Sequence, residues 1–563
     1  MAGVSEDLKA PPSAVRAPEA GRPRWTARLP RVVAAASSGL ITGFAALGVA
    51  ELVSAAIRPE ASPITAVGGA VIDRTPPALK DFAVRNFGTN DKLVLQLGIL
   101  ALLAVFAMTV GVVALRHRLA GSAAVLVFGA VGAVSAAGRP DSGPLDALPS
   151  AVGALLACGV LYLLAGRLVP GTSPLSPASP PAGGPDGTRD GAGGAAGAGG
   201  AFDRRGFVIA ATAAVAASAG AGVVGRRLNA SGAAEAAASR QDIVLPHPAS
   251  PARPIPTGAD LRVPGMSSFT TSNKDFYRVD TALVVPRVDA ANWRLRIHGR
   301  GVPEPLTVSY QDLLQRELIE RDITLTCVSN PVGGPYVGNA RWIGVRLADL
   351  LREAGVRPPS EGGPADQLVA RSVDGMTIGS PVDTVMDGRD AMLVLGMNGE
   401  PLPFEHGFPV RMLVPGLYGY VSACKWLEDL ELTTFDDYDA YWVKRTWSRR
   451  APIKTESRID TPRPFAGPKA GKVPVAGVAW AQRRGISKVE VRVDGGPWHE
   501  ARLAAEDSRD TWRQWMWEWP ATSGSHTLEV RATDRDGYTQ TDERAETVPD
   551  GATGWHSVVV AVT

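Results

Sequence analysis

One cysteine, Cys327, stands where a chain can offer a thiolate to a ligand. It ends an alternating apolar pattern (Ile323, Leu325, Cys327) that is typical of a strand, and a loop rich in glycine and proline follows at residues 331–335. Glycine lets a backbone approach a ligand closely, and a thiolate is a ligand for soft metals. The pattern is compatible with a metal centre, although a lone cysteine is more often an inert core residue.

The other cysteines and one histidine offer competing chemistry. Cys327 could form a disulfide with Cys424 in an oxidising compartment, which would remove the thiolate. Cys327 and His406 could instead make a cysteine–histidine hydrolase pair, but no third residue at a useful spacing would orient the histidine. The chain has 3 cysteines, the third being Cys158, so it is not a disulfide-rich scaffold. It contains no CxxC or CxxCH segment, so neither an iron–sulfur cluster nor a c-type haem is expected.

Two long segments resemble one known family. The segment ITLTCVSNPVGGPYVGNARWIGVR, residues 323–346, resembles the metal-ligating segment of the sulfite oxidase family of molybdopterin oxidoreductases. The segment NGEPLPFEHGFPVRMLVPGLYGYVSACKWL, residues 398–427, resembles the pterin-binding segment of that family. With the C-terminal domain, the resemblance covers residues 255–563. Two blocks in the right order are more specific than a lone cysteine, and they imply oxygen-atom transfer on a small oxoanion, sulfur compound or sulfoxide.

The resemblance also implies the roles of individual residues. Cys327 would be the protein ligand of molybdenum in a molybdenum–molybdopterin cofactor (Mo-MPT), and a metal neighbour would favour its thiolate form. His406 and Arg411 match the family's contacts with the pterin phosphate, which a guanidinium can bind through two hydrogen bonds. Segment 422–425 would add backbone amides and one cation. The remaining cofactor-binding residues implied are Asn273, Tyr277, Arg278, Ser372, Ser422, Ala423 and Lys425.

The residues that would face the substrate are less closely defined. Arg341 could face an anionic substrate or pair with a local carboxylate, Asp349 or Asp322. Tyr336 offers a hydroxyl group. Animal sulfite oxidases carry an arginine shortly after the cysteine, whereas residues 328–330 are Val-Ser-Asn here. The substrate and the direction of the reaction therefore stay open, and a methionine-sulfoxide reductase role or a non-catalytic, membrane-tethered binding protein with the same fold are alternatives.

These residues must be positioned by the elements around them, and the sequence pattern over residues 255–450 predicts an α+β domain. Short strands alternate with short helices, and Ser309 is a candidate helix N-cap. A hairpin is expected across Asp374-Gly375. The expected strands are 293–297, 323–327, 369–373, 376–378 and 392–395, and the expected helices are 310–317 and 347–354.

The first part of the chain predicts an α-helical transmembrane unit over residues 32–169, after a cytoplasmic tail at 1–31. Four apolar runs each supply the ~20 residues that cross a bilayer. Arginine-rich flanks place both ends of this unit in the cytoplasm. The unit contains one histidine, His117, so we do not expect a haem within it. The runs are 32–57, 93–115, 119–137 and 149–168.

A further apolar helix is expected after a Pro/Gly/Ala/Ser-rich linker at 170–203. Residues 204–226 begin with paired arginines and resemble a twin-arginine export signal. The alternative is a fifth span whose arginines mark the cytoplasmic side. Both interpretations place everything after residue 225 outside the bacterial cytoplasmic membrane, beginning with a linker at 227–254. Cleavage within 216–236 is an alternative to an uncleaved helix.

Residues 451–563 predict an Ig-like β-sandwich. Trp515, Trp517 and Trp519 alternate along one strand and would share a packed face. The domain resembles the family's dimerisation domain, and a carbohydrate-binding or adhesion module is the competing assignment. The expected strands are 473–480, 488–493, 512–519, 526–533 and 556–562.

The partners expected from the sequence are a small-molecule substrate, the lipid bilayer, a separate membrane or soluble electron carrier, and a second copy of the chain through the C-terminal domain. The formal net charge is +2 over 563 residues, so the composition gives no reason to expect nucleic-acid binding.

Overall fold

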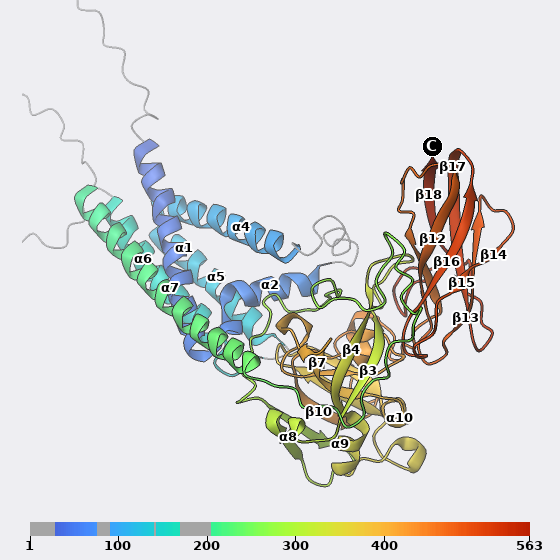
Figure 1. The fold of residues 1–563 in the computed structure, drawn as a ribbon. Coiled ribbons are helices and arrows are strands. Elements are labelled where there is room, and N and C mark those ends of the chain that lie inside the picture. Colours follow the sequence, from blue (N-terminus) through green and yellow to red (C-terminus); the bar gives the residue numbers. More distant parts are fainter. Residues whose placement is uncertain (1–28, 76–90, 140–141, 169–203) are drawn as a thin grey trace, which may run out of the picture.

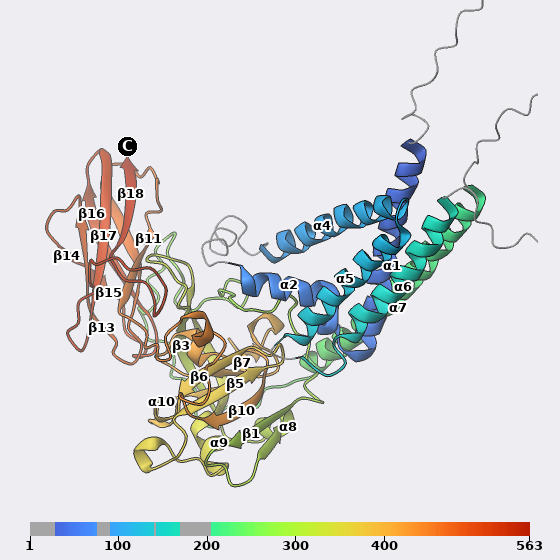
Figure 2. The same cartoon turned by 180° about the vertical axis from the view of Figure 1, so that it is seen from behind.

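The computed structural model describes residues 29–75, 91–139, 142–168 and 204–563. The chain forms a helical bundle, a central domain built on sheets, and a C-terminal domain made of strands (Figure 1). The central domain lies between the other two in both views (Figures 1 and 2). The predicted tail up to residue 28 and the predicted linker 170–203 lie outside the described residues.

The helical bundle contains the apolar runs that the sequence indicated. Five described helices are long and apolar enough to cross a membrane. A shorter helix, α2 (Pro63–Arg74), was not predicted. The five long helices are α1 (Leu29–Ile57), α4 (Asp91–Ala114), α5 (Arg118–Ala137), α6 (Leu148–Leu168) and α7 (Arg204–Gln241).

Small residues bring these helices close together. α1 packs against α6, α7 and α4. A Cβ atom placed on Gly48 would lie 2.6 Å from the Ser218 carbonyl oxygen, and one on Gly39 would collide with the Ala107 carbonyl. Close helix crossings of this kind are typical of membrane bundles, where small side chains allow backbone-to-backbone contact.

Helix α7 continues beyond its predicted end at residue 226. The prediction of a linker over 227–254 is therefore wrong in its first part, because the helix ends at Gln241. Alanine-rich sequence at 230–239 has a high helix propensity. The last turn is also held in place, since the Arg240 guanidinium donates to the carbonyls of Leu402 and Pro401 at 2.7 and 2.6 Å. The helix thus leads directly onto the central domain.

The central domain has two five-stranded sheets with short helices at their margins, which confirms the α+β expectation. One sheet has the order β2-β1-β10-β5-β6, and the other has β3-β4-β7-β8 with β9 paired to β7. The first contains β1 (Arg294–Gly299), β2 (Leu306–Ser309), β5 (Gln367–Ser372), β6 (Thr377–Pro381) and β10 (Leu427–Thr433). The second contains β3 (Leu318–Thr326), β4 (Val337–Arg346), β7 (Met392–Met397), β8 (Glu400–Pro401) and β9 (Arg411–Leu413).

The short helices follow the predicted positions with earlier ends. α8 carries the expected N-cap, because the Ser309 hydroxyl accepts from the Asp312 N–H and the Asp312 carboxylate accepts from the Ser309 N–H. The helices are α8 (Tyr310–Leu314), α9 (Leu347–Glu353), α10 (Val382–Met386) and α11 (Gly419–Ser422).

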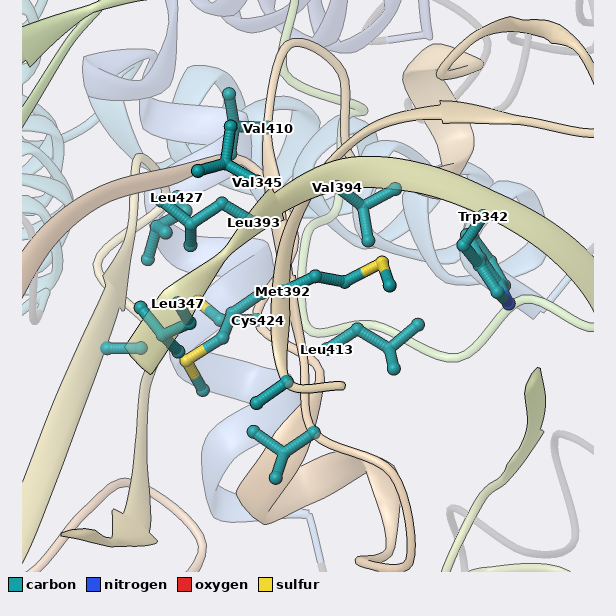
Figure 3. Close-up of a cluster of buried hydrophobic side chains, with 14 of the residues drawn as sticks. Trp342, Val345, Leu347, Met392, Leu393, Val394, Val410, Leu413, Cys424 and Leu427 are labelled. Carbon is teal, nitrogen blue, oxygen red and sulfur yellow. The ribbon is translucent and has the colours of Figure 1, made fainter. Parts of the chain in front are cut away.

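A hydrophobic core joins the elements of the central domain. Trp342 of β4, Met392 of β7 and Leu413 of β9 point into it (Figure 3). Cys424 is also one of these core residues, and its side chain is fully buried (Figure 3).

The C-terminal domain is a β-sandwich whose two four-stranded sheets share one hydrophobic core. The sheet orders are β11-β12-β16-β15 and β14-β13-β17-β18. Trp515 and Trp519 of β16 are buried in the core and Trp517 packs against it, as expected for a packed aromatic face. The strands are β11 (Glu456–Thr461), β12 (Gly471–Trp480), β13 (Ile486–Val493), β14 (His499–Glu500), β15 (Arg502–Leu503), β16 (Arg513–Ala521), β17 (Gly524–Asp534) and β18 (His556–Val562).

The sandwich is fixed to the strand that precedes Cys327. The Gln482 amide donates to the Thr324 carbonyl at 3.1 Å, and the Trp512 N–H donates to the Thr324 hydroxyl at 2.7 Å. Trp480 and Trp512 belong to the hydrophobic core of the central domain. The two domains therefore share a core and do not merely touch.

Candidate active site

Cys327 lies directly after β3, at the start of a short closed loop. Its N–H donates to the Tyr336 carbonyl at 2.9 Å, and its carbonyl accepts from the Asn330 N–H at 3.1 Å. The Asn330 side-chain oxygen accepts from the Tyr336 N–H at 2.8 Å, which ties the two ends of the loop together. The strand and these hydrogen bonds give the thiol one fixed position.

The Cys327 thiol is free and 9% exposed, and Cys424 is free as well, so the disulfide alternative is wrong. Burial raises the pKa of the Cys327 thiol. Hydrogen bonds from Ser329 and the charge of Lys425 act in the opposite direction. A thiol in such a place becomes a thiolate when a metal replaces its proton.

The Tyr277 phenol interacts electrostatically with both Cys327 and Arg411. Burial raises the pKa of Tyr277, the charge of Cys327 raises it further, and the charge of Arg411 lowers it. The ring stacks on Phe276 at 5.1 Å and meets Tyr336 edge-on at 6.4 Å. Cys327, Tyr336 and Arg411, which come from two segments of the chain, therefore all act on the surroundings of Tyr277.

Arg411 is a buried cation whose hydrogen bonds are incomplete. It is 6% exposed, and one terminal nitrogen donates to the His406 carbonyl at 3.1 Å. Its Nε–H has no partner, and its guanidinium carbon lies 5.2 Å from the centre of the Trp342 ring. Burial lowers the pKa of Arg411 to about 10. Buried donors are almost always satisfied, so this one indicates a missing acceptor.

His406 is held by the segment that precedes the first strand. Its Nε2 lies 2.8 Å from the Asn273 carbonyl oxygen, so Nε2 donates and Nδ1 is left as an acceptor. Burial lowers the pKa of His406 to about 4, which keeps the ring neutral. The Asn273 side-chain oxygen in turn accepts from the Asn398 amide at 2.8 Å. Asn273 and His406 therefore form one connected unit.

Lys425 is nearly buried and paired. Its ammonium group donates to Asp280 at 2.7 Å and to the Glu405 carbonyl at 3.2 Å. Burial lowers the pKa of Lys425 to about 8 despite the attraction of Asp280. Arg278 reaches the same carboxylate at 3.0 Å from a more exposed position. Asp280 was not predicted, because no local pattern distinguishes it from other acidic residues of a loop.

Two predicted residues, Ser422 and Ala423, are engaged in hydrogen bonds within the chain, whereas the Ser372 hydroxyl is not. The Ser422 hydroxyl donates to the carbonyls of Leu417 and Tyr418. The Ala423 N–H donates to the Gly419 carbonyl, so it is not available to a phosphate. Ser372 is fully buried at the end of β5 and pairs with Leu427, and its hydroxyl has no partner.

Arg341 lies in a different network. Its guanidinium forms an ion pair with Asp322 at 2.6 Å and donates to the Arg253 carbonyl at 3.2 Å. The local carboxylate pairing, which the sequence left open, is the one that the structure adopts. Tyr336, the other predicted substrate-facing residue, borders Tyr277 beside Cys327.

The residues present fit a cofactor with a metal and a phosphate. Arg411 Nε, Asn330 Nδ2 and Ser372 Oγ are buried without partners, and a polar, anionic group would supply them. Within the described ranges, no three His, Cys, Asp or Glu side chains are placed to hold a metal together. A metal bound by Cys327 would thus take its remaining ligands from a bound group, as a dithiolene cofactor provides.

The C-terminal sandwich closes over the loop that carries Cys327. The Arg458 guanidinium donates to the Gly334 carbonyl at 2.8 Å and is itself held by Asp460 at 2.6 Å. A Cβ atom on Gly333, whose φ is +75°, would lie 2.0 Å from the His556 ring. We call Arg458 and His556 the loop clasp. No sequence signal could have found them, because more than 100 residues separate them from the loop.

Comparisons with known proteins agree with this geometry. The family described as "Oxidoreductase molybdopterin binding domain" matches residues 282–442. The human protein "Sulfite oxidase, mitochondrial" is 29% identical over 314 residues, which are 48% of this chain and 57% of that protein. The Bacillus subtilis (strain 168) protein "Uncharacterized oxidoreductase YuiH" is 31% identical over 189 residues, which are 34% of this chain and 87% of that protein.

Among solved structures, the sulfane dehydrogenase SoxCD from Paracoccus pantotrophus is 23% identical. The match covers 53% of this chain and 84% of that chain, with a TM-score of 0.46. The chain spans about half the length of the mitochondrial sulfite oxidases that it matches.

Proposed function

This chain belongs to the sulfite oxidase family of molybdopterin oxidoreductases, and from that premise we propose that it is a membrane-anchored enzyme that acts outside the cytoplasmic membrane. Its reaction would be oxygen-atom transfer on a small sulfur compound, sulfoxide or oxoanion. The observation that carries this proposal is that two segments which resemble the family's cofactor-binding segments supply a free buried thiol, Cys327, and a buried cation, Arg411, whose Nε–H has no partner.

The bound Mo-MPT would supply the oxygen-atom and two-electron chemistry. The residues of the chain do the binding and positioning. Cys327 would ligate the metal from a strand end that Asn330 and Tyr336 keep rigid. Arg411 would anchor the phosphate with its unpaired Nε–H, and the neutral His406 would offer Nδ1 as an acceptor. Rigid support of this kind is what a redox cofactor needs to meet its substrate in one orientation.

Tyr336 is the proposed substrate-facing group, because it borders Tyr277 next to the thiol. Arg341 and Lys425 are left out of this role, because Asp322 pairs with the guanidinium and Asp280 with the ammonium group. The charge of Lys425 still acts on Cys327, which suits a small, oxygen-bearing substrate.

The placement outside the membrane rests on the helices. Five of them have the length and composition of spans, and arginines flank the predicted cytoplasmic ends. α7 begins with Arg204-Arg205, and its last turn contacts the central domain. If α7 crosses the membrane once, the central domain lies on the side opposite to these arginines. The C-terminal sandwich would be Ig-like and would pair two copies, and a separate carrier would exchange electrons with the enzyme.

The test is molybdenum analysis of the full-length protein, expressed with the cofactor-assembly machinery and compared with Cys327→Ser and with Cys158→Ser. We expect about one molybdenum per chain in the parent and in Cys158→Ser, since Cys158 lies in α6. Cys327→Ser should lose the metal–thiolate absorption and the activity. A well-folded parent that takes up no molybdenum would overturn the proposal and leave a tethered binding protein.

A further inference from the structure

Asn398 and Gly399 form the turn between β7 and β8. Met397 pairs with Glu400 across this turn, and the φ angles of Asn398 and Gly399 are +52° and +84°. Asn-Gly is the usual pair for a two-residue hairpin turn with positive φ at both positions. Aspartate or glycine would serve the turn as well as asparagine does. The contacts of the Asn398 side chain indicate a second role.

The side chain of Asn398 joins two other segments of the central domain. Its oxygen accepts from the N–H of Arg341 in β4 at 2.9 Å. Its amide group donates to the Thr271 carbonyl at 2.9 Å and to the side-chain oxygen of Asn273 at 2.8 Å. A side-chain amide offers an acceptor oxygen and two N–H donors, and both donors are used here. An ionised aspartate has the same shape but no donor, so it could not make the last two contacts.

The segment that Asn398 holds is the one that supports His406. The Asn273 carbonyl accepts from His406 Nε2 at 2.8 Å, and the His406 carbonyl accepts from the Arg411 guanidinium at 3.1 Å. Hydrogen bonds therefore connect Asn398 to Arg411 in series, through Asn273 and His406. His406 and Arg411 are the two residues that match the family's contacts with the pterin phosphate.

The side chain of Asn273 is engaged in the same network. Its oxygen accepts from Asn398, and its amide donates to the Met397 carbonyl at 3.3 Å. Thr271, two residues earlier, is tied to β4, because its N–H donates to the Asn339 carbonyl at 2.7 Å. These contacts favour a supporting role for Asn273, through its carbonyl, over the direct cofactor contact that the resemblance implies.

Packing restricts the His406 ring, and the hydrogen bond fixes its tautomer. Phe276 meets the ring edge-on at 5.6 Å, and it meets Trp342 in the same way at 5.6 Å. A Cβ atom on Gly338 would lie 2.9 Å from Phe276, so Phe276 has little room to move. These contacts do not select the ring nitrogen that carries the proton. The Asn273 carbonyl does, because it requires an N–H at Nε2 and leaves Nδ1 as the acceptor.

We propose that Asn398 is a positioning residue of the cofactor site: it fixes the Asn273 carbonyl, and thereby the His406 tautomer whose Nδ1 accepts a hydrogen bond from the bound cofactor. This inference rests on the proposed function. Loss of the Asn398 amide would release the Asn273 carbonyl, and the ring would then carry its proton on either nitrogen.

His406 stays neutral at pH 7 whether or not its hydrogen bond is present. Burial lowers the pKa of His406 to about 4, and the charges of Arg411 and Lys425 act in the same direction. The hydrogen bond with Asn273 and the charge of Glu405 raise this pKa, so loss of the hydrogen bond would lower it further. A measurement at pH 7 therefore reports the tautomer of a neutral ring.

The experiment compares the full-length parent with Asn398→Asp and Asn398→Gly in lipid nanodiscs, with nitrogen-15 in the histidine rings. Asn398→Asp places a carboxylate against two acceptors. Asn398→Gly removes the side chain and keeps the turn, because glycine adopts positive φ without strain. The ring nitrogen shifts of the cofactor-free protein at pH 7 report the tautomer, and the His406 signal is the one that His406→Gln lacks. We expect the Nε2–H tautomer alone in the parent and a mixture of tautomers in both variants.

Molybdenum content is the second measurement, on the same proteins expressed with the cofactor-assembly machinery. We expect about tenfold less molybdenum per chain in Asn398→Asp and Asn398→Gly, as is typical when a residue that orients a binding group is lost. The matched control is Asn292→Asp, an exposed asparagine of the same domain that pairs with Asp289. It should keep both the single tautomer and the molybdenum content of the parent.

A single tautomer together with full molybdenum content in both Asn398 variants would overturn the inference. A change in only one of the two measurements would also overturn it. Loss of molybdenum with a single tautomer would mean that Asn398 stabilises the domain without acting through His406. The tautomer is measured without the cofactor, so a parent that takes up no molybdenum would contradict the proposed function and leave this measurement intact.

Discussion

Arg411 offers the most direct test of a single residue. As a buried cation it should destabilise the cofactor-free fold, whereas as a phosphate anchor it should favour cofactor binding. Its guanidinium is buried with an unpaired Nε–H, and burial lowers its pKa to about 10. Arg411→Met keeps the bulk and removes a cation that is costly to bury. We expect at least tenfold less molybdenum per chain, together with an unchanged or higher midpoint of thermal unfolding for the cofactor-free protein.

The control for this variant is Arg300→Met. Arg300 is an exposed arginine of the central domain that pairs with Asp437 and is not among the candidate site residues, so its loss should leave the molybdenum content unchanged. Equal molybdenum content in Arg411→Met and the parent would contradict the role of Arg411 as a phosphate anchor.

At the residue scale, sequence reasoning works best where candidate residues stand in a contiguous segment. Cys327, His406 and Arg411 stand in two long blocks, and Arg411 of the second block donates to the His406 carbonyl and interacts with Tyr277, as Cys327 does. Arg341 was ambiguous, because the partner that claims it, Asp322, lies on the neighbouring strand. Asp280 was missed because only the folded chain places it beside Lys425.

At the scale of elements, β11 holds the loop that begins at Cys327. Arg458→Met removes the hydrogen bond to the Gly334 carbonyl and should loosen that loop. In the cofactor-free protein with a Cys158→Ser background, we expect iodoacetamide to modify Cys327 several times faster. Mass spectrometry of the digested protein separates Cys327 from the fully buried Cys424.

The control is Arg463→Met, an exposed arginine shortly after β11. It should leave the rate of modification unchanged. An unchanged rate in Arg458→Met would show that the loop keeps its shape through its own hydrogen bonds.

Long periodic elements could be predicted, and elements that depend on neighbours could not. The apolar runs and the five longer strands of the sandwich were placed to within a few residues. The two-residue strands β14 and β15 carry too few residues for a period to appear. The end of α7 was misplaced because contacts of Arg240 with another domain extend the helix.

At the scale of the whole molecule, Glu456 couples the contact between domains to pH. It lies in a wall of a cavity of about 400 Å³ in the sandwich, and its carboxyl accepts from the Tyr418 hydroxyl of the central domain at 3.5 Å. Burial raises the pKa of Glu456 to about 8, against about 4.3 in an unfolded chain. Between these values the folded state holds a proton that the unfolded state has lost. The contribution of Glu456 to the free energy of unfolding is therefore largest below about pH 4.3, and it decreases steadily as the pH rises to about 8.

Urea unfolding of the parent and Glu456→Gln at pH 6.5 and 8 measures this effect. The free energy of unfolding of the parent should fall across that interval, and the variant should fall less. Burial lowers the pKa values of His406 and His556 to about 4. Their contribution to the free energy of unfolding is lost only as the pH falls below 6.5, so they do not affect the interval from pH 6.5 to 8. Parallel slopes in the two proteins would contradict the assignment to Glu456.

The division into a bundle, an α+β domain and a sandwich could be predicted, because composition and strand spacing change along the chain. The way these parts meet could not. Trp480 and Trp512 have the pattern of core residues of the sandwich, yet they pack in the core of the central domain. Local periodicity shows that a side chain is buried, and it does not show which domain buries it.

The loop clasp sets an order for the maturation of this protein. His556 is the first residue of β18, the last strand, and it lies against Gly333 in the loop that begins at Cys327. A ribosome makes Cys327 more than 200 residues before His556. Until β18 is made, the nascent chain therefore lacks the contact of His556 with Gly333, and we expect its formation to fix the loop that begins at Cys327.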